Sequence, residues 1–235
     1  MPGSSERSAP AVELQTRNHS RSRLRNLLAP ALAGLVAMII YFVTMAPDLT
    51  WANYGSDGGE LITASITSGI PHPPGYPTYV LLGKIAALLP FGTAAWRFNF
   101  LSAVSAATAV AFVTATAQSV LNSPKLAGVK QKEAVVISTG LTVALSPLFW
   151  GQALITEVYA LNIAILSILL WSLLSGRSPL LSGVLLGLAV TTHLSSLIML
   201  PLALALTARS RWPYLLSGLF LGLLPFLILP LLARS

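Results

Sequence analysis

The sequence predicts an all-α, polytopic membrane protein with about seven transmembrane helices and one long external loop. Hydrophobic residues make up 54% of the 235 residues and charged residues only 9%, whereas an ordinary soluble domain carries roughly 25% charged residues. Seven apolar runs follow a polar N-terminal segment, and about 20 apolar residues are enough to cross a bilayer. This composition excludes a soluble enzyme, a disordered protein and a nucleic-acid-binding domain, so we expect the bilayer and no nucleic acid as partner.

The N-terminal segment, residues 1–26, is polar and rich in Ser and Arg, so we expect a disordered cytoplasmic tail. The first apolar run, Leu27 to Ala46, follows directly and predicts the first transmembrane helix. A cleaved signal peptide is the alternative interpretation, but its apolar core usually has only about 7–15 residues, and no small-x-small site follows this run. We therefore expect the transmembrane domain to cover residues 27–235.

Six further apolar runs predict the remaining spans: Phe98–Leu121, Ala134–Trp150, Tyr159–Leu174, Leu180–Thr192, Leu194–Thr207 and Tyr214–Leu232. The fifth and sixth spans are short and are separated at His193. We interpret them as a hairpin of two helices, with one long helix as the alternative. No Lys, Arg, Asp or Glu lies in the middle of any span, which argues against a proton-coupled pump or an ion carrier.

The distribution of basic residues predicts the orientation. With the N-terminus inside, the cytoplasmic segments contain 11 of the 14 Lys and Arg residues, and the external segments contain Lys84, Arg97 and Arg234. This bias agrees with the positive-inside rule. Residues 47–97 then form an external loop, and loops of that length without a function are uncommon. Cysteine is absent, so disulfides and thiolate metal sites are excluded.

The external loop begins with a predicted short helix from Gly58 to Ser68, which we expect to end at Gly69. Asp57 and Glu60 lie at its start, three residues apart, and therefore share one face of the helix. Such a pair could supply a general base beside the membrane. The same spacing also fits a capping box, in which the two side chains cap the helix.

A proline-rich segment, Ile70–Pro77, follows and predicts a stiff, non-helical stretch that carries His72 and Tyr76. The next helix, Thr78–Leu89, is too short to span the bilayer, so we expect it at the membrane interface. His72 is either a functional residue or a histidine that hydrogen-bonds within the turn. Lys84 is either a phosphate ligand or an interfacial lysine.

Two more charged residues complete the set of candidates. Glu157 follows the third span in ITEVYALN, and Arg97 precedes the second span in WRFNF. Each is either an interfacial anchor beside a tryptophan or part of the same external site. The sequence has no Walker A, G-x-G-x-x-G, D-x-D, H-E-x-x-H or G-x-S-x-G motif, and its three histidines are far apart in the sequence. No cofactor and no metal site is therefore predicted.

Together, the segments GSDGGE, HPPGYP and ITEVYALN resemble the membrane glycosyltransferases of the GT-C fold, over roughly residues 40–232. The branch to which they are most similar includes an animal protein O-mannosyltransferase. The resemblance implies sugar transfer on the non-cytoplasmic face, usually with inversion, from a polyprenyl- or dolichyl-phosphate carrier. It also implies that the acidic motif, and hence the catalytic pair, is Asp57 and Glu60, and that the histidine–proline segment is His72 to Pro77.

The chemistry of the external loop agrees with this interpretation. Nucleotide sugars are cytoplasmic, so a transferase that faces outward needs a lipid-borne donor. A hydroxyl acceptor is a poor nucleophile, so a carboxylate base is useful. The departing lipid phosphate needs positive charge or hydrogen-bond donors, for which Lys84, Arg97 and His72 are the candidates. With Tyr76 and Glu157, they make up the expected donor-binding set.

The predicted function is that of a membrane glycosyltransferase that transfers a mannose-like hexose to a hydroxyl group of a protein or glycan. The alternatives are a non-catalytic or truncated membrane module of the same fold and, less favoured, a small transporter. GT-C enzymes usually have more spans, so we expect a longer architecture or a partner chain that completes the fold. We expect a multi-pass protein of a bacterial inner membrane, with the endoplasmic reticulum as the alternative.

Overall fold

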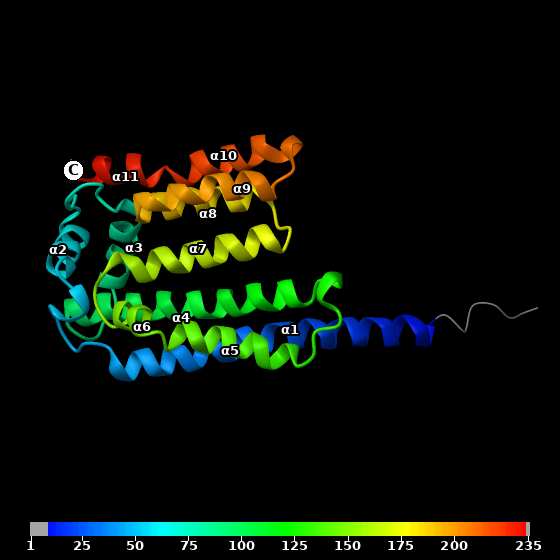
Figure 1. Cartoon of the computed structure of the whole chain (residues 1–235). Coiled ribbons are helices and arrows are strands. Elements are labelled where there is room, and N and C mark those ends of the chain that lie inside the picture. The colour runs from blue at the N-terminus through cyan, green and yellow to red at the C-terminus, as the bar shows by residue number, and fades with distance from the viewer. Residues whose placement is uncertain (1–8, 234–235) are drawn as a thin grey trace, which may run out of the picture.

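The computed structural model is all-helical. It describes the backbone of residues 9–233 and the side chains of residues 27–233, and no β-strand occurs in the described backbone. Successive long helices run in opposite directions between the two ends of a bundle, and α2 and α3 lie at one of these ends (Figure 1). These short helices are α2, Gly58–Thr67, and α3, Pro77–Ala87. Both lie within the predicted external loop.

Helix α1, Ala9–Thr44, begins well inside the segment for which we predicted a disordered tail. Arg, Ala, Leu, Gln and Glu are frequent in residues 9–26, and these residue types favour helix. The first predicted span forms the second half of this helix. Residues 1–8 lie outside the described residues.

Three helical segments are long and apolar enough to cross a membrane: Leu27–Thr44 in α1, α4 at Ala94–Leu121, and Arg209–Leu232. The last contains η4 (Arg209–Arg211), α10 (Trp212–Gly222) and α11 (Pro225–Leu232). The chain is therefore a helical membrane protein. The shorter apolar helices include α7, Val158–Leu174, and α8, Pro179–Thr192, so the count of seven spans stays a prediction.

The third predicted span, Ala134–Trp150, is not one straight helix. It consists of α5, Lys132–Ala144, and α6, Pro147–Ala153, which are bent by 64° relative to each other. The break falls just before Pro147, because a proline disfavours helical backbone in the residue that precedes it. The bent pair is a fourth candidate span if its two helices are counted together.

The two helices predicted on either side of His193 are separate, and the alternative of one long helix is wrong. His193 has extended backbone (φ −155°, ψ 121°) between α8 and the 3₁₀ helix η3, Leu194–Met199. Helix α9, Leu200–Leu206, continues from η3 and lies beside α8 (Figure 1). His193 therefore lies at the same end of the bundle as α2 and α3.

Small residues allow the helices to approach closely. Helix α4 packs against α1, α5 and α7 through a cluster rich in buried alanines. In α8 and α10, a Cβ at any of four glycines would come within 2.0–2.5 Å of a backbone oxygen of the other helix: Gly183, Gly187, Gly218 and Gly222. These two interlocking small-xxx-small pairs are typical of helix contacts in membranes.

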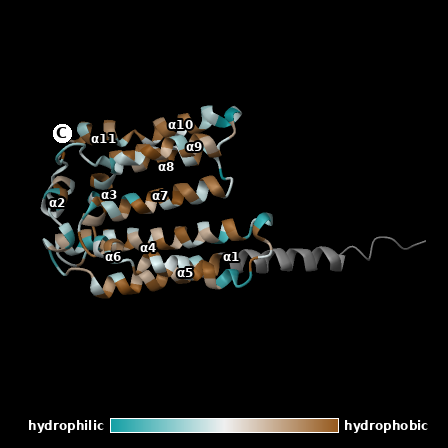
Figure 2. Ribbon diagram, in the orientation of Figure 1, coloured by the Kyte–Doolittle hydropathy of each residue, from teal (hydrophilic) through white to brown (hydrophobic). Residues whose placement is uncertain are grey.

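Polar residues gather at the two ends of the bundle, and apolar residues cover the helices between them (Figure 2). We call the end formed by residues 45–93, 154–157 and 193 the acidic end. We call the end formed by residues 122–131, 175–178 and 207–211 the basic end. The loops of the basic end contain five basic residues: Lys125, Lys130, Arg177, Arg209 and Arg211.

Candidate active site

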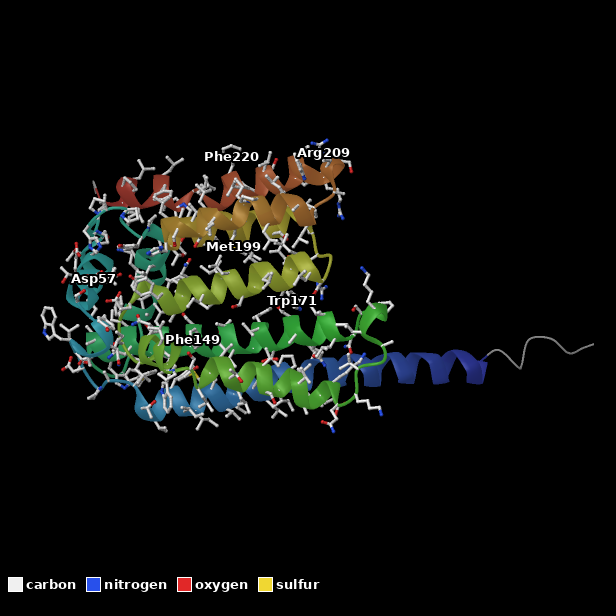
Figure 3. The ribbon with its side chains drawn as sticks, viewed as in Figure 1. Asp57, Phe149, Trp171, Met199, Arg209 and Phe220 are labelled. Atoms are coloured by element: carbon white, nitrogen blue, oxygen red, sulfur yellow. The ribbon has the colours of Figure 1, made fainter. Side chains whose placement is uncertain are left out.

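His72 links the two carboxylates that the sequence singles out. Asp57 immediately precedes α2, and Glu60 lies in its first turn, at the acidic end (Figure 3). The backbone N–H of His72 donates to Oε1 of Glu60 (2.6 Å), and its Nδ1 lies 2.6 Å from Oε2. The other ring nitrogen, Nε2, lies 3.7 Å from Oδ2 of Asp57. The proline-rich segment therefore places an imidazole between the two acidic groups.

The capping-box interpretation of Asp57 and Glu60 is wrong. The side chain of Asp57 caps no N–H group of α2, and its Oδ1 instead accepts a hydrogen bond from the Ser56 hydroxyl (3.0 Å). Glu60 bonds to His72 rather than to the start of its own helix. The two carboxylate side chains are 35% and 45% exposed, so both are accessible to a substrate.

The electrostatics of this group favour a charged histidine. The hydrogen bond with Glu60 raises the pKa of His72, and the negative charges of Glu60, Asp57 and Glu157 act in the same direction. The same hydrogen bond lowers the pKa of Glu60. The charged form of His72 is therefore more stable here than in a free histidine.

Aromatic side chains border the carboxylates. The hydroxyl group of Tyr76 lies 2.8 Å from Nε2 of His72. The Tyr76 ring stacks on the ring of His193, with the ring centroids 6.3 Å apart. The ring centroid of Tyr159 lies 5.5 Å from that of the same histidine. Sequence reasoning missed His193 and Tyr159, and it treated the histidines as unrelated. The turn between α8 and η3 brings two of them to one site.

Glu157 lies beneath Asp57. Its side chain is only 2% exposed, which does not fit an interfacial anchor, and Oε1 accepts a hydrogen bond from the backbone N–H of Asp57 (3.3 Å). Burial raises the pKa of Glu157 to about 7, and the N–H group of Asp57 opposes part of this effect. Glu157 therefore contacts Asp57, although the two residues are 100 positions apart in the chain. We call Asp57, Glu60, His72 and Glu157 the acidic cluster.

A buried amide side chain holds the start of the predicted external loop on the bundle. Asn99 of α4 donates through Nδ2 to the carbonyl groups of Ala46 (2.9 Å) and Asp48 (3.2 Å). Its Oδ1 accepts a hydrogen bond from the Thr156 hydroxyl (2.7 Å), next to Glu157. Sequence reasoning missed Asn99, although an amide in a largely apolar helix was a signal that could have identified it.

Lys84 and Arg97 bond elsewhere. Lys84 donates to the hydroxyl of Ser68, the left-handed residue that ends α2 where we predicted Gly69 (φ 62°). Arg97 donates through Nε to the carbonyl of Phe91 (2.9 Å) and through Nη1 to that of Ala87 (2.7 Å). Both side chains thus stabilise the ends of the short helices. Their role as phosphate ligands stays a prediction.

A shallow groove of about 340 Å³ runs beside the acidic pair. It lies between α2 and the proline-rich segment, and its lining includes Gly59, Glu60, Thr63, Thr67, Ile70 and Pro71. Within the described side chains, no group of three His, Asp or Glu residues is arranged to hold a metal ion. Glu60 therefore lines an open groove.

These features define a class of protein: a helical membrane protein in which Asp57, Glu60, His72 and Glu157 form one site at the end of the bundle. Comparison with known proteins identifies the family. A family model described as the Protein O-mannosyl-transferase TMEM260 N-terminal domain matches residues 57–216. The chain belongs to this family, which confirms the resemblance predicted from the loop motifs.

Two curated relatives carry the same name, Protein O-mannosyl-transferase TMEM260. The one from Mus musculus is 33% identical over 138 residues, which are 56% of this chain and 18% of the relative. The one from Dictyostelium discoideum is 30% identical over 127 residues, 53% of this chain and 14% of the relative. The chain thus spans less than a fifth of the length of either relative. No solved structure matches it.

Proposed function

We propose that the chain carries the catalytic loop of a membrane glycosyltransferase. The enzyme transfers a mannose-like hexose from a polyprenyl- or dolichyl-phosphate carrier to a hydroxyl group of a protein or glycan. The observation that carries this proposal is the group of Asp57, Glu60 and His72 at one end of apolar helices. The names of the relatives support O-mannosyl transfer to a protein.

We also propose seven membrane crossings in a GT-C-type arrangement. The shorter helices lie alongside the long ones between the same two ends (Figure 1), which supports counting them as spans. Basic residues gather in the loops of one end, and that asymmetry supports a cytoplasmic basic end. The transmembrane domain then starts at residue 27, after a cytoplasmic segment, and residues 47–97 form the external catalytic loop.

The relatives are eukaryotic, so they do not support the predicted preference for a bacterial inner membrane. They favour the alternative, the endoplasmic reticulum. In that membrane the acidic end faces the lumen, where a lipid-borne sugar is the available donor.

In the proposed reaction, the acceptor oxygen bonds to the anomeric carbon while the bond from that carbon to the phosphate oxygen breaks. The lipid phosphate leaves with the electron pair, and Asp57 takes the proton of the acceptor hydroxyl. Glu60 holds His72 next to Asp57, and the role proposed for this imidazole is to donate to the departing phosphate. Of the three predicted phosphate ligands, His72, Lys84 and Arg97, His72 is the one that lies beside Asp57.

Asp57→Asn tests the proposed base. Transfer from radiolabelled polyprenyl-phosphate mannose should fall about 10²–10⁴-fold, because loss of a general base typically costs that much. Membrane insertion should be unchanged. Asp48→Asn is the matched control, since Asp48 is an exposed carboxylate of the same loop outside the cluster. Normal transfer by Asp57→Asn, or an equal loss in the control, would contradict this role.

A further inference from the structure

A cleft at the basic end takes no part in the proposed transfer. It has a volume of about 510 Å³ and lies between α1 and the ends of α4 and α7. This volume falls within the range of small-molecule sites, about 300–1,000 Å³. Trp171 forms part of its wall, and Figure 3 shows this residue well away from Asp57.

The lining of the cleft changes from apolar to polar toward the loops. Its apolar residues are Leu27, Pro30, Ala31, Ala111, Phe112, Ala115 and Trp171. Along α4, the polar residues Gln118, Ser119 and Asn122 follow near the end of the helix. From Ala111 to Asn122 the helix rises about 16 Å, at 1.5 Å per residue. The cleft therefore offers a long apolar wall with a polar rim.

Arg177 supplies the charge at this rim. Its guanidinium group lies over the ring of Trp171, 4.6 Å from the ring centroid. The described residues that line the cleft include no carboxylate, so none of them neutralises this charge. Four other basic residues belong to the loops of the same end: Lys125, Lys130, Arg209 and Arg211.

We propose that this cleft binds a membrane phospholipid with an anionic headgroup. One acyl chain lies against the apolar walls, and the headgroup phosphate bonds to Arg177 at the rim. Arg177 favours an anionic over a zwitterionic headgroup, because its guanidinium group attracts the net negative charge of the first and repels the ammonium group of the second. The cleft lies at the opposite end of the bundle from the acidic cluster, so this lipid is distinct from the sugar donor.

Native mass spectrometry tests this proposal on the purified 235-residue chain in detergent. The probes are phosphatidylglycerol and phosphatidylcholine with identical acyl chains. We expect saturable binding of one phosphatidylglycerol, about fivefold tighter than phosphatidylcholine, because one nearby Lys or Arg attracts an anionic lipid by about that factor. Arg177→Gln should remove the preference. Ala115→Leu, and Ala31→Leu on the wall formed by α1, should weaken the binding of both lipids.

Arg209→Gln is the matched control. Arg209 also lies over a tryptophan at the basic end, 5.5 Å from the ring centroid of Trp212, but it does not line the cleft. This variant should keep the full preference for phosphatidylglycerol. Equal affinity for the two lipids in the unchanged chain, an equal loss in both arginine variants, or unchanged binding in both leucine variants would overturn the proposal. The assay needs no transferase activity, so its outcome is independent of the proposed function.

Discussion

The stability of the protein depends on pH through one buried carboxyl group, that of Glu157. Because burial raises the pKa of Glu157 from 4.5 to about 7, the folded protein holds this proton more tightly than the unfolded chain does. The resulting stabilisation is complete below pH 4.5 and is lost as the pH rises through 7. Relative to Glu157→Gln, the unchanged protein should therefore lose stability over this interval, by up to about 3 kcal/mol.

Thermal unfolding of both proteins in detergent, at several pH values, measures this difference. Asp48→Asn serves as a control, because Asp48 is an exposed carboxylate of the same loop and does not contact Glu157. A gap between Glu157→Gln and the unchanged protein that stays constant with pH would show that folding does not shift the pKa of Glu157.

The contact between His72 and Glu60 should shift the pKa values of the two residues in opposite directions. Its hydrogen bond raises the pKa of His72 above 6.5 and lowers that of Glu60 below 4.5. The pair therefore stabilises the fold between the two shifted pKa values, and this contribution disappears as the pH falls through that of Glu60 or rises through that of His72. In Glu60→Gln, the pKa of His72 should return toward its ordinary value.

Histidine-labelled protein in NMR reports this titration, and the resonance of His72 is assigned by its loss in His72→Gln. Thr63→Ala is a suitable control, because Thr63 lies on the same helix but contacts its own helix backbone. A titration of His72 that does not change in Glu60→Gln would rule out the pair.

Among the elements, the contact between α8 and α10 depends most on residue size. A Cβ at Gly218 would lie 2.1 Å from the carbonyl oxygen of Leu180, so Gly218→Ala has to push the two helices apart. Overpacking of this kind costs about 1–3 kcal/mol. The variant should unfold at a lower temperature than the unchanged protein.

Gly128→Ala is the matched control for this substitution, because a Cβ at Gly128 meets nothing within 4 Å. Equal melting temperatures of the two variants, measured in the same detergent, would show that the helices do not pack as closely as described.

For the whole molecule, the arrangement of charge predicts which end faces the cytoplasm. Single cysteines are informative because the chain contains none. Pro90→Cys places an exposed thiol at the acidic end, and Gly128→Cys places one at the basic end. In sealed cells or vesicles of known orientation, an impermeant reagent applied on the non-cytoplasmic side should label only the first, in accord with the positive-inside rule.

Permeabilised membranes, in which both thiols should react, provide the control for accessibility. Labelling of the thiol at position 128 but not of that at position 90 in intact membranes would reverse the proposed orientation. It would also place the acidic cluster among cytoplasmic nucleotide sugars and so remove the need for a lipid-borne donor.

The sequence by itself determined the helical class, most helix positions and the acidic pair in the external loop. These properties are local: apolar run length sets a span, and glycine and proline set its ends. The sequence predicted the break at His193 but not the bend before Pro147. Both residues interrupt apolar runs, but the run around Pro147 predicted one continuous span.

Only the tertiary structure decided which side chains meet. Glu157 reaches Asp57 because the link between α6 and α7 passes under the start of α2, and His193 reaches Tyr76 because α8 ends beside α3. Lys84 and Arg97 bond to the ends of the short helices, contacts that the sequence did not indicate. Contacts between residues this far apart in the chain depend on helix packing and on the pairing of buried polar groups. Neither leaves a periodic pattern in the sequence.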